Sequence, residues 1–297
     1  MPKLLDPQTL AKVQGLRLRA KHIVEGLIAG SHRSPHRGFS IEFAEHRDYA
    51  SGDDLRYLDW KVLGRTDKYY IKQFEDETNL ICNLVVDVSE SMRYRGPDAA
   101  MSKLEYAQCL AATIGWLVLQ QQDAVGLVTF DDQVRNLVPP SGSPVQLQQV
   151  IDVLQTADSK EKTQIGPLLH ELSGRLNRRG LVIVMSDFFD EVDSIMAGLK
   201  HLKYRKHDII LLHILDPAEL DFPFDRPTMF HGLEAFPELL ADPISVRKAY
   251  RQEIEAFVND LRSQSLASQM DYAQIRTDQP FDAVLRNFLN HRNARLV

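Results

Sequence analysis

The chain has 297 residues, of which 44% are hydrophobic and 26% are charged, the balance of an ordinary globular protein. This composition excludes collagen-like, low-complexity and wholly disordered chains, and the length predicts one elaborated domain or two modest ones. The 35 Lys and Arg residues against 41 Asp and Glu residues give a net charge of −6. That balance argues against nucleic acid as a partner, and the basic stretch 12–37 lacks the interleaved aromatic residues typical of nucleic-acid binding.

The cysteine content and the apolar runs predict where the protein is found. Cys82 and Cys109 lie in apolar surroundings without metal-ligand spacing, which predicts buried thiols in a reducing cytosol. No segment has the pattern of a secretory signal, and the longest apolar runs are too short to cross a bilayer. We therefore expect a cytoplasmic protein without a membrane span, although a membrane-associated client remains compatible with this expectation.

The N-terminal part, residues 1–79, differs in pattern from the rest. Residues 6–29 carry a helical stripe of apolar residues, and a turn-rich linker follows them. The stretch 38–79 is polar and mixed, with the signs of a strand near Tyr69 to Phe74. We expect an N-terminal extension of helices and short strands.

From residue 80 onward, short apolar strands alternate with amphipathic helices. This alternation predicts an α/β fold with a doubly wound, mostly parallel sheet covered by helices on both faces. Proline and aromatic residues interrupt it at about 216–243, which predicts an inserted loop or hairpin within a domain of residues 80–297. The expected strands are 79–86, 124–130, 134–138, 181–185, 208–215 and 271–276, and the expected helices are 102–121, 144–156, 165–178, 190–204, 246–264 and 281–292.

The first buried strand ends in a cluster of oxygen-bearing side chains. Asp87, Ser89 and Ser91 follow it directly, and ligands of open α/β sheets bind outside the carboxyl ends of the strands. Carboxylate and hydroxyl oxygens suit Mg²⁺, a hard cation. The alternative is that these residues only cap a helix, because Ser and Asp are good N-caps.

Two further residues complete a candidate site if their segments are neighbours of the first strand. Thr163 stands just before an expected helix, and Asp187 follows another buried strand. Thr163 is otherwise a helix N-cap and Asp187 a turn residue. Together with Asp87, Ser89 and Ser91, they would offer two carboxylates and three hydroxyls to one divalent cation.

The order of these residues resembles the von Willebrand factor A domain with its metal-ion-dependent adhesion site. The resemblance implies that Ser89, Ser91 and Thr163 are direct or near-direct ligands, and that Asp87 and Asp187 bind through waters. It implies Mg²⁺, or Mn²⁺ or Ca²⁺, bound weakly until a partner protein adds a carboxylate to the metal.

A second resemblance rests on the N-terminal stretch. Arg37 to Phe43, Arg47 to Tyr49, Gly52 to Trp60 and Arg65 are similar to the signature of a bacterial family called domain of unknown function 58, with Leu58 and Gly64 as mild departures. Many members carry two N-terminal membrane helices, so this chain resembles the soluble subtype. The resemblance implies an adaptor or target recogniser that works with a MoxR-type AAA+ ATPase in protein assembly or activation.

Two other readings of the same residues stay open. Asp87 at a strand end is also the position of a phosphoryl-accepting nucleophile, as in a phosphatase or phosphotransferase. The acid/base carboxylate that such enzymes place two residues later is here Ser89, and the chain has no P-loop, GxGxxG or GxSxG motif. We therefore expect no catalysis, and the remaining alternative is a metal-free scaffold protein.

Overall fold

The chain divides into two units in the computed structural model. One unit comprises Met1–His32 with Leu80–Val297, and the other comprises Arg33–Asn79. The expected boundary after residue 79 coincides with the end of the second unit, whereas the first 32 residues group with the α/β unit. The structure describes residues 6–30, 43–48, 60–66, 69–74, 80–157, 165–226, 228–230 and 239–286.

The centre of the α/β unit is a six-stranded sheet with the strand order β10-β7-β6-β3-β4-β5. Neighbouring strands are parallel except for β4 and β5, which pair antiparallel at one edge. The first strand of this sheet along the chain, β3, is central. The chain continues to β4 and β5 on one side of β3 and then to β6, β7 and β10 on the other side, as in a doubly wound sheet. This confirms the predicted fold class, an α/β fold with a doubly wound, mostly parallel sheet, and adds an antiparallel edge strand. The strands are β3 (Ile81–Asp87), β4 (Ala124–Phe130), β5 (Val134–Ser141), β6 (Leu181–Ser186), β7 (Asp208–Leu215) and β10 (Asp271–Arg276).

The central strands read as continuous apolar runs because both of their faces are buried. In β3, Leu84 and Val86 belong to one hydrophobic core, and Val85 between them belongs to the other. This alternation follows from the two-residue period of a strand, which sends successive side chains to opposite faces.

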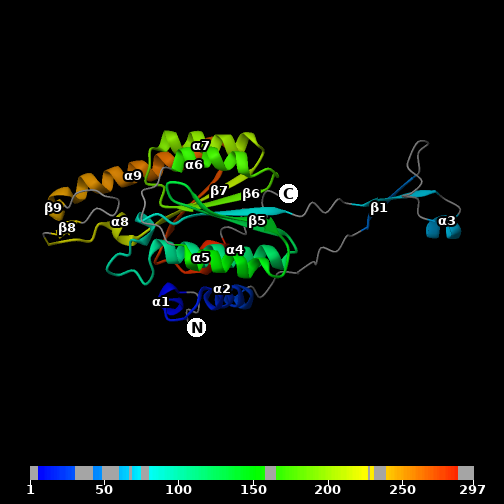
Figure 1. Cartoon of the computed structure of the whole chain (residues 1–297), viewed down its shortest axis with the longest axis horizontal. Helices are drawn as coiled ribbons and strands as arrows, with labels where there is room; N and C mark the ends of the chain where they lie inside the picture. The colour runs from blue at the N-terminus through cyan, green and yellow to red at the C-terminus, as the bar shows by residue number, and fades with distance from the viewer. Residues whose placement is uncertain are drawn as a thin grey trace. The chain divides into compact units, whose positions relative to one another are not determined.

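Helices cover both faces of the sheet (Figure 1). On one side lie α4 (Lys103–Gln120) and α5 (Gln146–Thr156), and on the other lie α6 (Ile165–Arg175), α7 (Val192–Tyr204) and α9 (Pro243–Ala267).

The helices α6 and α7 touch closely because two glycines meet there. A Cβ atom on Gly198 would lie 2.6 Å from the carbonyl oxygen of Gly166.

The predicted helix over 6–29 is two helices, α1 (Pro7–Leu10) and α2 (Leu16–Gly30). Gly15 between them has φ +85°, a conformation that favours glycine and that interrupts the helix. The helix α2 contributes apolar side chains such as Ile23 to the core that contains α4. Because α4 is covered by the sheet on one side and by α2 on the other, it is apolar around most of its circumference. The expected burial of Cys82 and Cys109 is confirmed.

The interruption after β7 contains a short helix and a short hairpin, as the prolines and aromatic residues predicted. These are α8 (Pro217–Asp221) and the antiparallel pair β8 (Thr228–Phe230) and β9 (Leu239–Ala241). The second unit contains β1 (Phe43–Asp48), α3 (Trp60–Thr66) and β2 (Tyr70–Phe74), with β1 and β2 antiparallel.

Candidate functional site

The loop after β3 holds three of the predicted site residues in a tight turn. The carboxylate of Asp87, the last residue of β3, accepts the backbone N–H of Ser89 at 2.9 Å. The hydroxyl oxygens of Ser89 and Ser91 lie 3.1 Å apart. All three residues are buried. Two hydroxyls and one carboxylate thus meet at the carboxyl edge of the sheet.

The neighbouring strand β6 brings a second carboxylate to the same edge. The hydroxyl of Ser186, the last residue of β6, donates a 2.6 Å hydrogen bond to the Asp87 carboxylate. Asp187 follows directly, and the backbone then takes a left-handed turn at Phe188, with φ 53°. The Phe188 N–H closes this turn on the Ser186 hydroxyl at 2.8 Å. The register of parallel β3 and β6 therefore brings Ser186 opposite Asp87, and Asp187, the next residue, lies within electrostatic reach of Asp87.

Thr163, the fifth predicted site residue, lies outside the described residues. The first residue of α6, Ile165, donates its N–H to the carboxylate of Asp190 at 2.9 Å. The beginning of α6 is therefore tied to the same loop that carries Asp187.

A buried lysine contacts the second carboxylate. The Lys103 ammonium lies 2.7 Å from Oδ2 of Asp187 and 2.6 Å from Oε1 of Glu219. It also lies 4.9 Å from the ring centroid of Phe189. Burial alone would lower the pKa of Lys103, but the charges of Asp187 and Glu219 outweigh burial and raise it above its usual range. Lys103 is therefore a permanent cation beside Asp187.

The Asp87 carboxylate has no cation of its own among the described residues. Burial, followed by repulsion from Asp187, raises the pKa of Asp87 to about 7, although hydrogen bonds from Ser186 and Ser89 oppose this rise. A cation placed beside a buried carboxylate of this kind stabilises its ionised form. Oxygen donors of this set are the ligands that Mg²⁺ and Ca²⁺ take, so the residues present fit a hard divalent cation.

A buried histidine lies in the layer next to this loop. His213 of β7 makes an edge-to-face contact with Phe188, with ring centroids 5.6 Å apart. Its Nδ1 lies 2.6 Å from the Tyr272 hydroxyl. Burial lowers the pKa of His213 to about 4, so this imidazole is neutral near pH 7.

The sequence reasoning did not find Lys103, Ser186, Glu219 or Asp190. Two features of the sequence could have pointed to Lys103 and Ser186. Lys103 directly follows the N-cap Ser102, a position where the helix dipole disfavours a cation. Ser186 immediately precedes Asp187 at the end of a buried strand.

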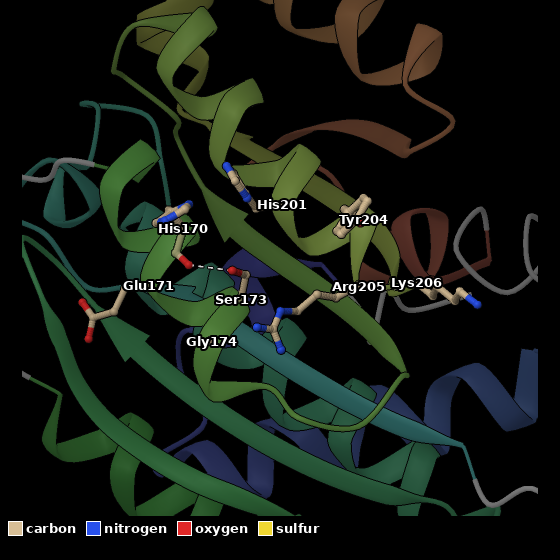
Figure 2. A pocket seen from close by; sticks show the side chains of 8 residues that line it. All are labelled: His170, Glu171, Ser173, Gly174, His201, Tyr204, Arg205 and Lys206. Atoms are coloured by element: carbon tan, nitrogen blue, oxygen red, sulfur yellow. Dashed lines mark hydrogen bonds between the residues drawn. The ribbon is translucent and has the colours of Figure 1, made fainter.

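A separate groove of about 740 Å³ lies between α6 and α7 (Figure 2). It begins near His170 and His201, whose rings meet edge to face with centroids 4.1 Å apart. Ser173, Tyr204 and Arg205 also line it, toward the C-terminal ends of the two helices. None of the predicted site residues that the structure describes lines this groove.

Several solved structures are similar to this chain. BatB from Bacteroides thetaiotaomicron is 15% identical, with a TM-score of 0.45 over 71% of this chain and 98% of that chain. An aerotolerance-related membrane protein from Bacteroides fragilis is 15% identical, with a TM-score of 0.47 over 71% of this chain and 99% of that chain. The VWA domain of SpRpn10 is 11% identical, with a TM-score of 0.39 over 71% of this chain and 95% of that chain.

The expectation of a cytoplasmic protein is contradicted. The structural neighbours include the membrane protein from Bacteroides fragilis and one from Vibrio fischeri that is described as membrane spanning. Within the ranges that the structure describes, no helix is both long enough and apolar enough to span a bilayer.

Sequence comparison identifies the family. Uncharacterized proteins of Mycobacterium tuberculosis and Mycobacterium bovis are 25% identical over 292 residues, which covers 97% of this chain and 90% of theirs. The model of the family described as protein of unknown function DUF58 matches residues 45–263, more than half of the chain. This chain is therefore a member of the DUF58 family.

Proposed function

We propose that this chain is a divalent-cation-dependent protein-binding module, which acts as an adaptor or target recogniser beside a MoxR-type AAA+ ATPase. The observation that carries the proposal is the meeting of Asp87, Ser89, Ser91 and Asp187 at the carboxyl edge of β3 and β6. This edge is where open α/β sheets bind their ligands. The von Willebrand A-like fold agrees with a role in protein interaction.

The residues that would hold the cation are Ser89 and Ser91 directly, with Asp87 and Asp187 through waters and with Thr163 as the fifth. When bound, the cation would supply a coordination position for a carboxylate from a client protein. The chain's own residues fix the donor atoms beforehand, since the Ser89 N–H and the Ser186 hydroxyl each hold one oxygen of Asp87. The MoxR-type ATPase is proposed as the partner because the N-terminal signature of this chain resembles that of the domain of unknown function 58 family.

Binding rather than catalysis is supported by the surroundings of Asp87. Its side chain is completely buried, and both of its oxygens accept hydrogen bonds from the protein. A nucleophile in phosphoryl transfer needs an oxygen that is free to approach the phosphorus in line. The position of the second acid in such enzymes is taken by Ser89, whose hydroxyl faces Ser91.

Ser89→Ala tests the proposal with little risk to the fold. The Ser89 hydroxyl lies beside that of Ser91 and also hydrogen-bonds the Asp87 carboxylate, so its removal takes away a ligand while the turn keeps its backbone bond. Calorimetric titration of Mg²⁺ and Mn²⁺ is expected to show saturable binding to the wild type and binding weakened at least about tenfold in the variant. Asp208→Asn is the matched control, because Asp208 is exposed at the start of β7, the opposite end of the sheet.

The partner is tested by pull-down of the MoxR-type ATPase from the same organism, with Mg²⁺ or with EDTA. Retention that depends on Mg²⁺ and is lost in Ser89→Ala supports the proposal. A folded wild type that binds neither Mg²⁺ nor Mn²⁺ would refute the cation dependence. Retention of the ATPase in EDTA would favour a metal-free scaffold.

A further inference from the structure

Two histidines meet in the groove between α6 and α7. His170 lies on α6 and His201 on α7, and their rings meet edge to face, with centroids 4.1 Å apart and ring planes at 87°. Both residues are exposed, and Figure 2 shows both rings at the same end of the groove. An ion from solution can therefore reach both imidazoles.

The imidazole nitrogens of this pair are available as ligands. Among the residues that the structure describes, neither imidazole takes part in a hydrogen bond or an ion pair. The Glu171 carboxylate, next to His170 in the chain, binds Arg175 instead, and the Ser173 hydroxyl donates to the backbone carbonyl of His170 rather than to its ring. A neutral imidazole has one nitrogen with a free lone pair, and it is the side chain that most often binds metals.

The close approach of α6 and α7 fixes the backbone beneath the two histidines. The helices touch at Gly166 and Gly198, where a Cβ on Gly198 would lie 2.6 Å from the Gly166 carbonyl oxygen. His170 follows Gly166 by four residues and His201 follows Gly198 by three, so each histidine lies about one helical turn beyond this contact. The pair therefore stands on two rigid elements, as a preorganised site requires.

The ring separation suits two imidazoles that share one metal ion. Zn–N bonds of about 2.1 Å at a tetrahedral angle place the centres of two imidazoles roughly 5 Å apart. The observed distance of 4.1 Å differs from this value by about 1 Å, which the rotation of exposed side chains can supply. The geometry therefore allows one nitrogen of each ring to bind the same ion.

The donor atoms select the class of ion. Imidazole nitrogen suits Zn²⁺, Ni²⁺ and Cu²⁺, whereas Mg²⁺ and Ca²⁺ take oxygen ligands. His201 lies in the last turn of α7, where the helix dipole favours a cation. Arg205 and Lys206 line the same groove and oppose a cation, but both are exposed, so that solvent and salt screen their charges.

We propose that His170 and His201 bind a transition-metal ion of the Zn²⁺ class, at a site separate from that of Asp87, Ser89 and Ser91. The two imidazole nitrogens are the ligands from the protein, and water fills the remaining positions. Within the described ranges, no third His, Cys, Asp or Glu joins them in a metal-binding group. The site does not depend on the proposed function, because it shares no residue with the oxygen ligands of that function.

Calorimetric titration of Zn²⁺ into the full chain, in excess Mg²⁺, tests this site. The Mg²⁺ competes with Zn²⁺ for oxygen ligands but not for imidazoles. Zn²⁺ binding is expected to weaken at least about tenfold in His170→Gln and also in His201→Gln, because each variant removes one of the two ligands. His22→Gln is the matched control: His22 is likewise exposed on a helix, α2, and its replacement should leave this affinity unchanged.

Electron paramagnetic resonance of Cu²⁺ gives a second readout that does not depend on affinity. One equivalent of Cu²⁺ in excess Mg²⁺ is expected to show hyperfine splitting from two imidazole nitrogens in the wild type. This two-nitrogen signal should be lost in His170→Gln and in His201→Gln, and kept in His22→Gln.

Three results would overturn the site. These are a wild type that binds no Zn²⁺, equal Zn²⁺ affinity in the wild type and both variants, and a loss in one variant only, since that histidine would then act without its neighbour. The proposed function is judged separately by Mg²⁺ binding to the wild type and to Ser89→Ala. A chain that binds Zn²⁺ through the pair but no Mg²⁺ or Mn²⁺ supports this site and refutes only the cation dependence proposed above.

Discussion

Replacing Asp87 by Asn should change how the stability of the metal-free protein depends on pH. Burial, and then Asp187, raise the pKa of Asp87 from 3.8 to about 7 in the folded protein. Between about pH 4 and pH 7 the folded protein therefore holds a proton that the unfolded chain has released. The contribution of Asp87 to the free energy of unfolding is full below pH 4 and is lost as the pH rises through 7.

The size of the effect follows from the two pKa values. The interval from 3.8 to about 7 corresponds to about 4 kcal/mol, since each pKa unit is worth about 1.4 kcal/mol. Asn has nearly the same shape and does not ionise. Relative to the wild type, the variant should therefore gain stability by up to about 4 kcal/mol between pH 4 and pH 7.

Urea unfolding in EDTA, followed by circular dichroism at four pH values from 4 to 7, measures this difference. Asp208→Asn is again the control, because this exposed carboxyl group should leave the profile parallel to that of the wild type. Parallel profiles for Asp87→Asn and the wild type would show that Asp87 is ionised in the folded protein throughout. That result would remove the electrostatic reason for placing a cation beside it.

Three further predictions concern other parts of the α/β unit. Gly198→Ala should lower the free energy of unfolding by about 2 kcal/mol or more, because the new Cβ would meet the Gly166 carbonyl. Gly174→Ala is the control, because a Cβ at Gly174 has open space, and it should raise the free energy of unfolding by up to about 1 kcal/mol. Urea titrations measure both changes. Burial lowers the pKa of His213 to about 4, so the contribution of His213 to the free energy of unfolding should fall by about 3 kcal/mol as the pH drops from 6.5 to 4, opposite in sign to the contribution of Asp87. His213→Phe removes this contribution, so its stability relative to the wild type should rise as the pH drops over that interval in the same titrations. Burial raises the pKa of the Cys109 thiol to about 12, so a thiol reagent such as DTNB should react with it only after unfolding, and prompt labelling of the native protein would contradict its burial.

The strands of the sheet were predictable because burial on both faces leaves a continuous apolar run. The expected bounds of β4 and β7 agree with the structure. The break at Gly15 was not predictable from the apolar stripe, because that stripe continues across it. The expected end of β5 at residue 138 was also wrong: the strand runs through Pro139 and Pro140 to Ser141, since an edge strand needs hydrogen bonds on one side only.

Only the parts of the candidate site that short stretches of sequence reveal were predictable. Asp87 and Asp187 stand at the ends of buried strands, and the sheet places the ends of neighbouring parallel strands together. Lys103 was not found because its partners are distant in sequence: Asp187 is 84 residues away and Glu219 is 116 residues away. Only the folded chain brings these charges together.

The two prolines of β5 also affect how copies of this protein can associate. In the described part of the chain, β5 pairs with β4 on one side and forms an edge of the six-stranded sheet. An exposed edge normally offers a row of N–H and C=O groups onto which another strand can add, which leads to polymerisation. Pro139 and Pro140 have no N–H group, so they interrupt that row. Strand addition at this edge is therefore disfavoured, and an assembly formed on this side would have to be built from side-chain contacts.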